Sequence, residues 1–264
     1  MFFWRKFQIV ILTAIFLFSL QTAVLAQQAK QRLIPYPSDY VLDQAGASSY
    51  KGLGNVPKSR YFNSLDFFKL RSNKQGLTIL SNYKTYQQTT ETTCGPAAAL
   101  TVLQHFGNTK YHELQLAGLM NCLNERNERG EIGTSTNNMA NFFSSIGWQV
   151  ESSQTFVGAA KPSFLEPTEF KNFILQHLQN NTPILVENID WGGHWRVIIG
   201  YDTMNTAHTH DDILIMADSY DVSDHQQDGY VVQPFEKFFY TWFDINMLPT
   251  EQRTQQWLAV SPQK

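Results

Sequence analysis

The stretch QQTTETTCGPAAALTVLQHFG, residues 87–107, joins a polar loop to a run of small and apolar residues, and Cys94 lies where the two meet. The apolar residues after Cys94 recur at helical spacing, while Pro96 suits the first turn of a helix and Gly107 its end. This pattern predicts a helix that begins at the cysteine. The free amides and dipole of a helix N-terminus favour a thiolate over a thiol, so we interpret Cys94 as a reactive residue.

A cysteine nucleophile needs a base within hydrogen-bonding distance and a group that orients this base. Among the seven histidines, His194 is the candidate, because in the segment WGGHWRVIIGYD it follows two glycines and opens an apolar run. Gly193 allows close approach to the imidazole, and Trp191 is a candidate wall of a substrate cleft. Taken alone, His194 could equally be a histidine without a catalytic role at the start of a strand. Together with Cys94 it is interpreted as a candidate general base.

The orienting group can be approached through a hairpin. If HWRVIIGYD and DILIMADSYD pair around the loop between them, a loop centre near residue 206 or 207 sets residues 218–220 opposite His194. Asp218 is then placed to accept a hydrogen bond from the imidazole and fix its tautomer. Asp221 is the second candidate, since a shift in register of a few residues would bring it there instead.

Stabilising the negative oxygen formed during attack on a carbonyl requires hydrogen-bond donors. The backbone amide of Cys94 can provide one donor. Gln88, six residues earlier on the loop that leads to Cys94, can provide its side-chain amide as the other. Gln87 takes that role if the loop is displaced by one residue.

The segments QTTETTCGPAA, GGHW and ADSY together resemble the papain-like cysteine peptidases of the bacteriocin leader-processing, or double-glycine, type. The resemblance covers roughly residues 77–264 and implies a papain-like fold with Cys94, His194, Asp218 and Gln88 as the catalytic set. Serine follows Asp218, where that family commonly has proline. Members of the family are usually cytoplasmic domains fused to a transporter, so the resemblance implies fold and chemistry without implying a double-glycine leader as substrate.

The order of the predicted elements indicates an α+β fold, in which an N-terminal helical part packs on a mainly antiparallel sheet. Helices are predicted within residues 95–106, 111–123, 135–146, 167–181 and 235–243, and strands within 76–86, 183–189, 194–202, 212–220, 229–233 and 257–260. We divide the chain into a signal peptide (1–26), an N-terminal arm or small subdomain (27–75) and a papain-like catalytic domain (76–264). Whether the arm is a propeptide stays open.

The N-terminus has the pattern of an export signal. Two basic residues precede the apolar run FQIVILTAIFLFSL, and Val24 and Ala26 lie at the spacing that a signal peptidase recognises. We expect cleavage near Ala26 and a secreted or periplasmic protein with no stable membrane insertion; an uncleaved anchor is the alternative. The net charge of -3 does not indicate a nucleic-acid partner.

The predicted function is hydrolysis of peptide or amide bonds by an exported cysteine peptidase, with a peptide or protein as substrate and no cofactor or metal. The alternatives are an acyl-transferring enzyme, similar to phytochelatin synthase, and a non-catalytic binding protein on the same scaffold. The pair His208 and His210 is interpreted as part of a solvated loop. Cys122 is interpreted as a buried thiol; a disulfide with Cys94 is the competing hypothesis.

Overall fold

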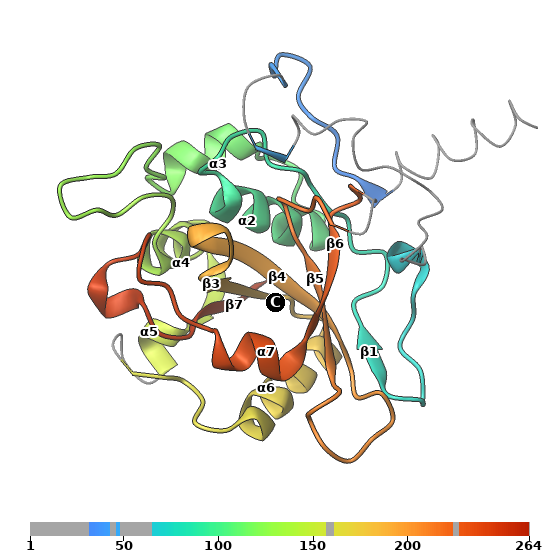
Figure 1. Ribbon diagram of the computed structural model, residues 1–264. Helices are drawn as coiled ribbons and strands as arrows, with labels where there is room; N and C mark the ends of the chain where they lie inside the picture. The colour runs from blue at the N-terminus through green and yellow to red at the C-terminus, as the bar shows by residue number, and fades with distance from the viewer. Residues whose placement is uncertain (1–31, 43–45, 48–64, 157–160, 224–226, 264) are drawn as a thin grey trace, which may run out of the picture.

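In the computed structural model, helices surround one antiparallel sheet (Figure 1). The structure describes residues 32–42, 46–47, 65–156, 161–223 and 227–263, so the predicted signal peptide lies outside the described residues. The helices are α2 (Cys94–His105), α3 (Glu113–Leu119), α4 (Thr136–Ser145), α5 (Ser153–Phe156), α6 (Pro167–Gln179), α7 (Phe235–Tyr240) and the short 3₁₀ helices η2 (Phe67–Lys69), η3 (Asp190–Gly192) and η4 (Thr250–Gln252). The strands are β1 (Leu77–Ile79), β2 (Trp148–Ser152), β3 (Ile184–Asn188), β4 (His194–Asp202), β5 (Ile213–Ala217), β6 (Tyr230–Pro234) and β7 (Gln256–Pro262).

The strands run in the order β2-β7-β3-β4-β5-β6, and β1 joins the sheet beside β4. Each of these pairs is antiparallel. Strand β4 lies at the centre: its first half pairs with β3, while its last residues pair with β1. The α+β class and the mainly antiparallel sheet predicted from the sequence are confirmed.

Strand β4 is buried along almost its whole length, which explains why its middle, residues 197–199, is a run of consecutive apolar residues rather than an alternating pattern. Helix α2 packs against it, and α6 also contacts it. In Figure 1, α2 lies on one side of the sheet and α6 and α7 lie on the other. The strand that begins with His194 is therefore fixed on both faces.

Local sequence signals set the ends of the helices. The hydroxyl of Ser135 accepts a hydrogen bond from the amide of Asn138 at 3.2 Å and so caps α4. Helix α6 begins with Pro167 and a reciprocal capping box between Glu166 and Glu169. Aromatic side chains then fix α6 and α7 on the sheet, for example Phe170 against Trp242 with ring centroids 4.4 Å apart.

Part of the N-terminal arm lies along the loop that leads to α2. Leu33 forms an isolated parallel bridge with Thr85, and the hydroxyl of Tyr36 donates to the carbonyl oxygen of Gln87 at 2.8 Å. These contacts hold residues 32–36 against residues 85–87, at the start of the polar loop that leads to Cys94. No helix within the described ranges is long and apolar enough to span a bilayer.

Candidate active site

Cys94 is the first residue of α2, as the sequence predicts. Its side chain is 2% exposed and lines a cavity of about 520 Å³ that His194 also lines. A Cβ atom on Gly95 would lie 2.8 Å from the Cβ of Thr134, so only glycine lets these two segments approach so closely. The thiol therefore lies at the bottom of a cavity, at the positive end of a twelve-residue helix.

The turn before His194 orients the imidazole. Trp191, Gly192 and Gly193 all have positive φ, at 57°, 86° and 124°. A Cβ atom on Gly193 would lie 2.5 Å from the Cγ of Met247, so this position needs glycine for space as well as for its backbone conformation. The two glycines thus let the chain reverse sharply and place His194 at the start of β4.

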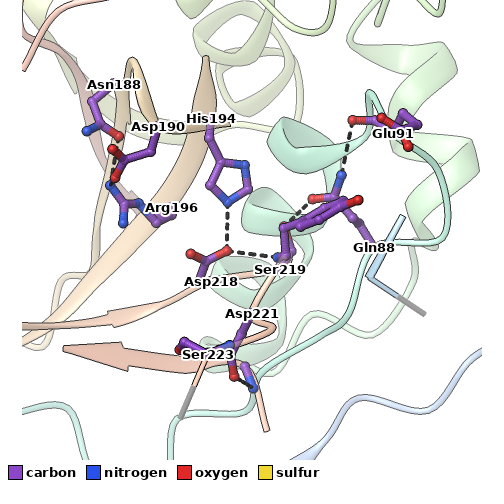
Figure 2. A network of polar contacts seen from close by, with 12 residues as sticks. Gln88, Glu91, Asn188, Asp190, His194, Arg196, Asp218, Ser219, Asp221 and Ser223 are labelled. Carbon is purple, nitrogen blue, oxygen red and sulfur yellow. Dashed lines mark hydrogen bonds and ion pairs between the residues drawn. The ribbon is translucent and has the colours of Figure 1, made fainter. Parts of the chain in front are cut away.

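His194 points at Asp218, which follows β5 directly (Figure 2). The distance from His194 Nε2 to Asp218 Oδ1 is 2.6 Å, and both side chains are buried. The same Oδ1 accepts the amide of Tyr220 at 2.8 Å, which fixes the carboxylate. Because Nε2 is held by Asp218, Nδ1 is the nitrogen left to face the thiol of Cys94.

Electrostatics favour a protonated imidazole at this place. Burial by itself lowers the pKa of His194, but the charge and hydrogen bond of Asp218, together with Cys94, outweigh it and raise the pKa to about 9. Burial also disfavours the charged form of Asp218 and so by itself raises its pKa. The charge and hydrogen bond of His194 and the Arg196 guanidinium nevertheless hold the pKa of Asp218 below its ordinary value. The pair is therefore arranged as an imidazolium beside a carboxylate.

The strand register accounts for the choice between the two aspartates. Strands β4 and β5 pair Val197 with Ala217, and a register shift between Ile198 and Gly200 follows. Continued toward His194, this register puts residue 220 directly across, so Asp218 reaches the imidazole diagonally on the same face.

Asp221, the second candidate, points elsewhere. Its carboxyl accepts the amide and hydroxyl of Ser223 and the amide of Gly229. Burial raises the pKa of Asp221 to about 8. These bonds tie it to the turn that follows β5, and the aspartate that contacts His194 is Asp218.

Gln88 lies beside the same cavity, but its amide is engaged. Its Nε2 donates to the carbonyl oxygens of Thr90 at 2.8 Å and Glu91 at 3.3 Å, and its Oε1 accepts the hydroxyl of Ser219 at 2.8 Å. To serve an oxyanion, Gln88 has to release the longer of these bonds, the one to Glu91. Gln87 does not line this cavity.

Trp191 and Gly193, the predicted substrate-binding residues, both line the cavity. Trp191 is 67% exposed, and its ring lies 5.3 Å from that of Tyr220. Arg126 lines the cavity as well and is held in place by the carbonyl oxygens of Gly130 and Asn246. The cavity lining thus combines an aromatic pair, of which Trp191 is exposed and Tyr220 half-buried, with a cationic group.

The role of Glu113 was not predicted from the sequence. This carboxylate, at the first position of α3, is fully buried and accepts hydrogen bonds from residues 86, 89 and 93: Tyr86 Oη at 2.8 Å, Thr89 N at 2.8 Å, Thr89 Oγ1 at 2.7 Å and Thr93 Oγ1 at 2.5 Å. It therefore fixes the loop that carries Gln88 and ends at Cys94. The only available signal was a charged residue on the inward side of an amphipathic helix.

Both cysteines are free thiols. The Cys122 Sγ donates to the carbonyl oxygen of Thr92 at 3.2 Å, and burial raises its pKa to about 11. Among the residues that the structure describes, no group of three or more His, Cys, Asp or Glu could hold a metal ion. His208 and His210 instead contact Asp211 and Glu236.

The chain is similar to known peptidases in sequence motifs and in fold. A model of the Peptidase_C39 like family matches residues 80–246, in agreement with the resemblance stated from the sequence motifs. The peptidase domain of Streptococcus ComA, a bi-functional ABC transporter of a quorum-sensing pathway, is 18% identical, with 69% of this chain and 99% of that chain covered and a TM-score of 0.42. A double glycine motif protease from an AMS/PCAT transporter, in complex with the leader peptide, is 15% identical, with coverages of 72% and 96% and a TM-score of 0.42. No curated protein matches the chain.

Proposed function

Because the chain belongs to the Peptidase_C39 like family and is a cysteine peptidase-like hydrolase, we propose that it cleaves peptide bonds with Cys94 as nucleophile. His194 serves as general acid and base, and Asp218 orients it. The observation that carries this assignment is the 2.6 Å contact from His194 Nε2 to Asp218 Oδ1, beside a cavity that Cys94 also lines. That contact leaves Nδ1 for exchange of a proton with the thiol.

In the acylation step, the Cys94 thiolate attacks the carbonyl carbon of the scissile peptide bond. The imidazolium of His194 donates its Nδ1 proton to the leaving amine as the carbon–nitrogen bond breaks, and a thioester remains on Cys94. In deacylation, the now neutral His194 takes a proton from water, whose oxygen attacks the thioester. The thiolate leaves, and the protonated imidazole is restored, so protons and charge balance over the cycle.

Two donors are proposed for the oxyanion. The backbone amide of Cys94 belongs to the first turn of α2, where amides have no partner within the helix. The side-chain amide of Gln88 is the second, with the bond to the carbonyl oxygen of Glu91, at 3.3 Å, as the one exchanged for the oxyanion. Ser219 supports this role, because its hydroxyl holds Gln88 Oε1 at 2.8 Å.

We further propose that the protein acts after export, outside the cytoplasm. The support for this is the sequence alone, in the apolar run FQIVILTAIFLFSL and the small residues Val24 and Ala26 that follow it. Sequencing the N-terminus of protein recovered from the producing cell tests it, and a chain that still begins before residue 27 would argue against cleavage.

The peptidase proposal is tested by incubating the mature protein with a pool of unfolded peptides and reading cleavage by mass spectrometry. We expect defined new termini that are lost in Cys94→Ala and kept in Cys122→Ser, the matched control for removal of a thiol. Products that carry a second peptide in place of water would instead indicate acyl transfer. Binding without turnover by the wild type would indicate a non-catalytic scaffold.

A further inference from the structure

One buried carboxyl group beside the site lacks well-formed hydrogen bonds. Glu187, in β3, is 0% exposed, and neither carboxyl oxygen has a partner of normal hydrogen-bond geometry among the described residues. The backbone amide of His194 is near enough to lower the pKa of this carboxyl, but burial and Asp244 outweigh it. The group within hydrogen-bonding contact is another carboxyl, that of Asp244 in the segment after α7. Two buried carboxylates in contact would repel each other without solvent to screen them, so one of the two holds a proton.

The hydrogen bonds of Asp244 indicate which member of the pair is the acceptor. Asp244 Oδ1 accepts the amide of Asn246 at 2.6 Å, and Oδ2 accepts that of Met247 at 3.0 Å. Glu187 has only the backbone amide of His194 nearby, without a hydrogen bond of normal geometry to either oxygen. A proton on Glu187 satisfies both groups at once, because the protonated Glu187 carboxyl can donate a hydrogen bond that the Asp244 carboxylate accepts.

This pair lies directly behind the catalytic turn. A Cβ atom on Gly193 would meet Asp244 Oδ2 at 3.0 Å and Met247 Cγ at 2.5 Å, and Met247 lines the cavity together with Cys94. In the sheet, Glu187 pairs with Trp195, next to His194. The segment that Asp244 holds thus supports the glycine turn from behind.

We propose that Glu187 is a positioning residue that carries a proton and donates it to Asp244, which holds residues 244–247 against Gly193 and leaves one negative charge, rather than two, beside Cys94. This inference rests on the proposed function, since it concerns the same site. The groups that act most on the Glu187 carboxyl include Asp244, Cys94 and the backbone of His194.

The electrostatics agree with the geometry. Burial, then the charge of Asp244 and its hydrogen bond, and then the charge of Cys94, raise the pKa of Glu187 well above its ordinary value. An ionised Glu187 would work against the Cys94 thiolate, because like charges in a dry site disfavour each other. A neutral Glu187 avoids that conflict.

Infrared spectroscopy detects the proton directly and does not depend on activity. At neutral pH the full protein is expected to show a carbonyl band of a protonated carboxylic acid that is missing from Glu187→Gln. Asp221, whose pKa is raised to about 8, contributes a band of its own, so the difference between wild type and variant isolates Glu187. Absence of any difference band would overturn the proposal even if the protein hydrolyses peptides.

Two substitutions of Glu187 distinguish a side chain that donates a hydrogen bond to Asp244 from one that only packs there. Glu187→Met is neutral but donates nothing, and we expect kcat to fall by about tenfold, the effect typical of losing a hydrogen bond to a charged group. Glu187→Gln can donate through its amide and is expected to restore most of that loss. Equal kcat in both variants contradicts a donor role. If the Met variant does not fold, the infrared difference still decides.

If Cys94→Ala abolishes cleavage and the infrared band of Glu187 is absent, the proposed function stands and only this inference fails. If the band is present and the wild type cleaves no peptide, the carboxyl pair stands and the peptidase assignment fails. The two results are therefore distinguishable.

Discussion

The charge of Asp218 can be removed with little change of shape. Asp218→Asn keeps an oxygen that can accept the amide of Tyr220, but it removes the negative charge 2.6 Å from His194 Nε2. The pKa of His194 is about 9 with that charge present, and its ordinary value is 6.5. At ~1.4 kcal/mol per pH unit, a return to the ordinary value costs the imidazolium about 3 kcal/mol.

Since acylation starts from the imidazolium and thiolate together, we expect kcat/KM of Asp218→Asn to fall by roughly two orders of magnitude. The assay is cleavage of one peptide across a range of pH, with Asp221→Asn as the matched control at the neighbouring carboxyl. The reasoning is refuted if Asp218→Asn keeps kcat/KM within about threefold of wild type, or if Asp221→Asn causes the larger loss.

The same ion pair links stability to pH. The pKa of His194 is higher in the folded state than in the unfolded chain, so folding binds a proton between those two values. The contribution is fully present below pH 6.5 and is lost as pH rises through about 9. Wild type should lose up to about 3 kcal/mol of unfolding free energy over this window, and Asp218→Asn should lose much less.

Three further substitutions test other parts of the site. Glu113→Gln places an amide against hydroxyl and amide donors and should lower the unfolding free energy by about 2–4 kcal/mol, measured by urea denaturation; no change would mean that the buried bonds to Thr93 are dispensable. Gly193→Ala forces a Cβ into Met247 at 2.5 Å and strains a φ of 124°, so Tm and kcat should both fall; a normal Tm would contradict this packing. Trp191→Ala should leave Tm nearly unchanged, because the ring is 67% exposed, while KM rises about tenfold; an unchanged KM would exclude it from substrate binding.

Much of the candidate site could be predicted because its residues lie at ends of elements. A cysteine at the start of a small-residue helix and a histidine after two glycines at the start of a strand are both visible in sequence, and hairpin geometry limited the third residue to a short range. The structure brings Cys94, His194, Asp218 and Gln88 to one place. The register shift between Ile198 and Gly200 could not be foreseen, and it decides how Asp218 reaches the imidazole.

The contacts behind the site could not be predicted, because they join distant segments. Glu113 is a charged residue on the inward side of its helix, but the sequence does not show which groups bind it. Glu187 interrupts an apolar strand without any local partner. Strand β2 also escaped prediction, since its five residues are only partly buried and pair with β7 more than a hundred residues later. In each case the tertiary structure determines the partner, and the local periodicity of the sequence does not show it.

Whether Cys94 is a nucleophile paired with His194 is decided by the rate of alkylation at each cysteine at neutral pH. We expect Cys94 to react with a small electrophile much faster than Cys122, because His194 and the start of α2 favour its thiolate, whereas burial raises the pKa of Cys122 to about 11. His194→Ala should slow the alkylation of Cys94 and leave that of Cys122 unchanged. If both cysteines react slowly, at rates that do not depend on His194, Cys94 is not the nucleophile and the peptidase mechanism is wrong.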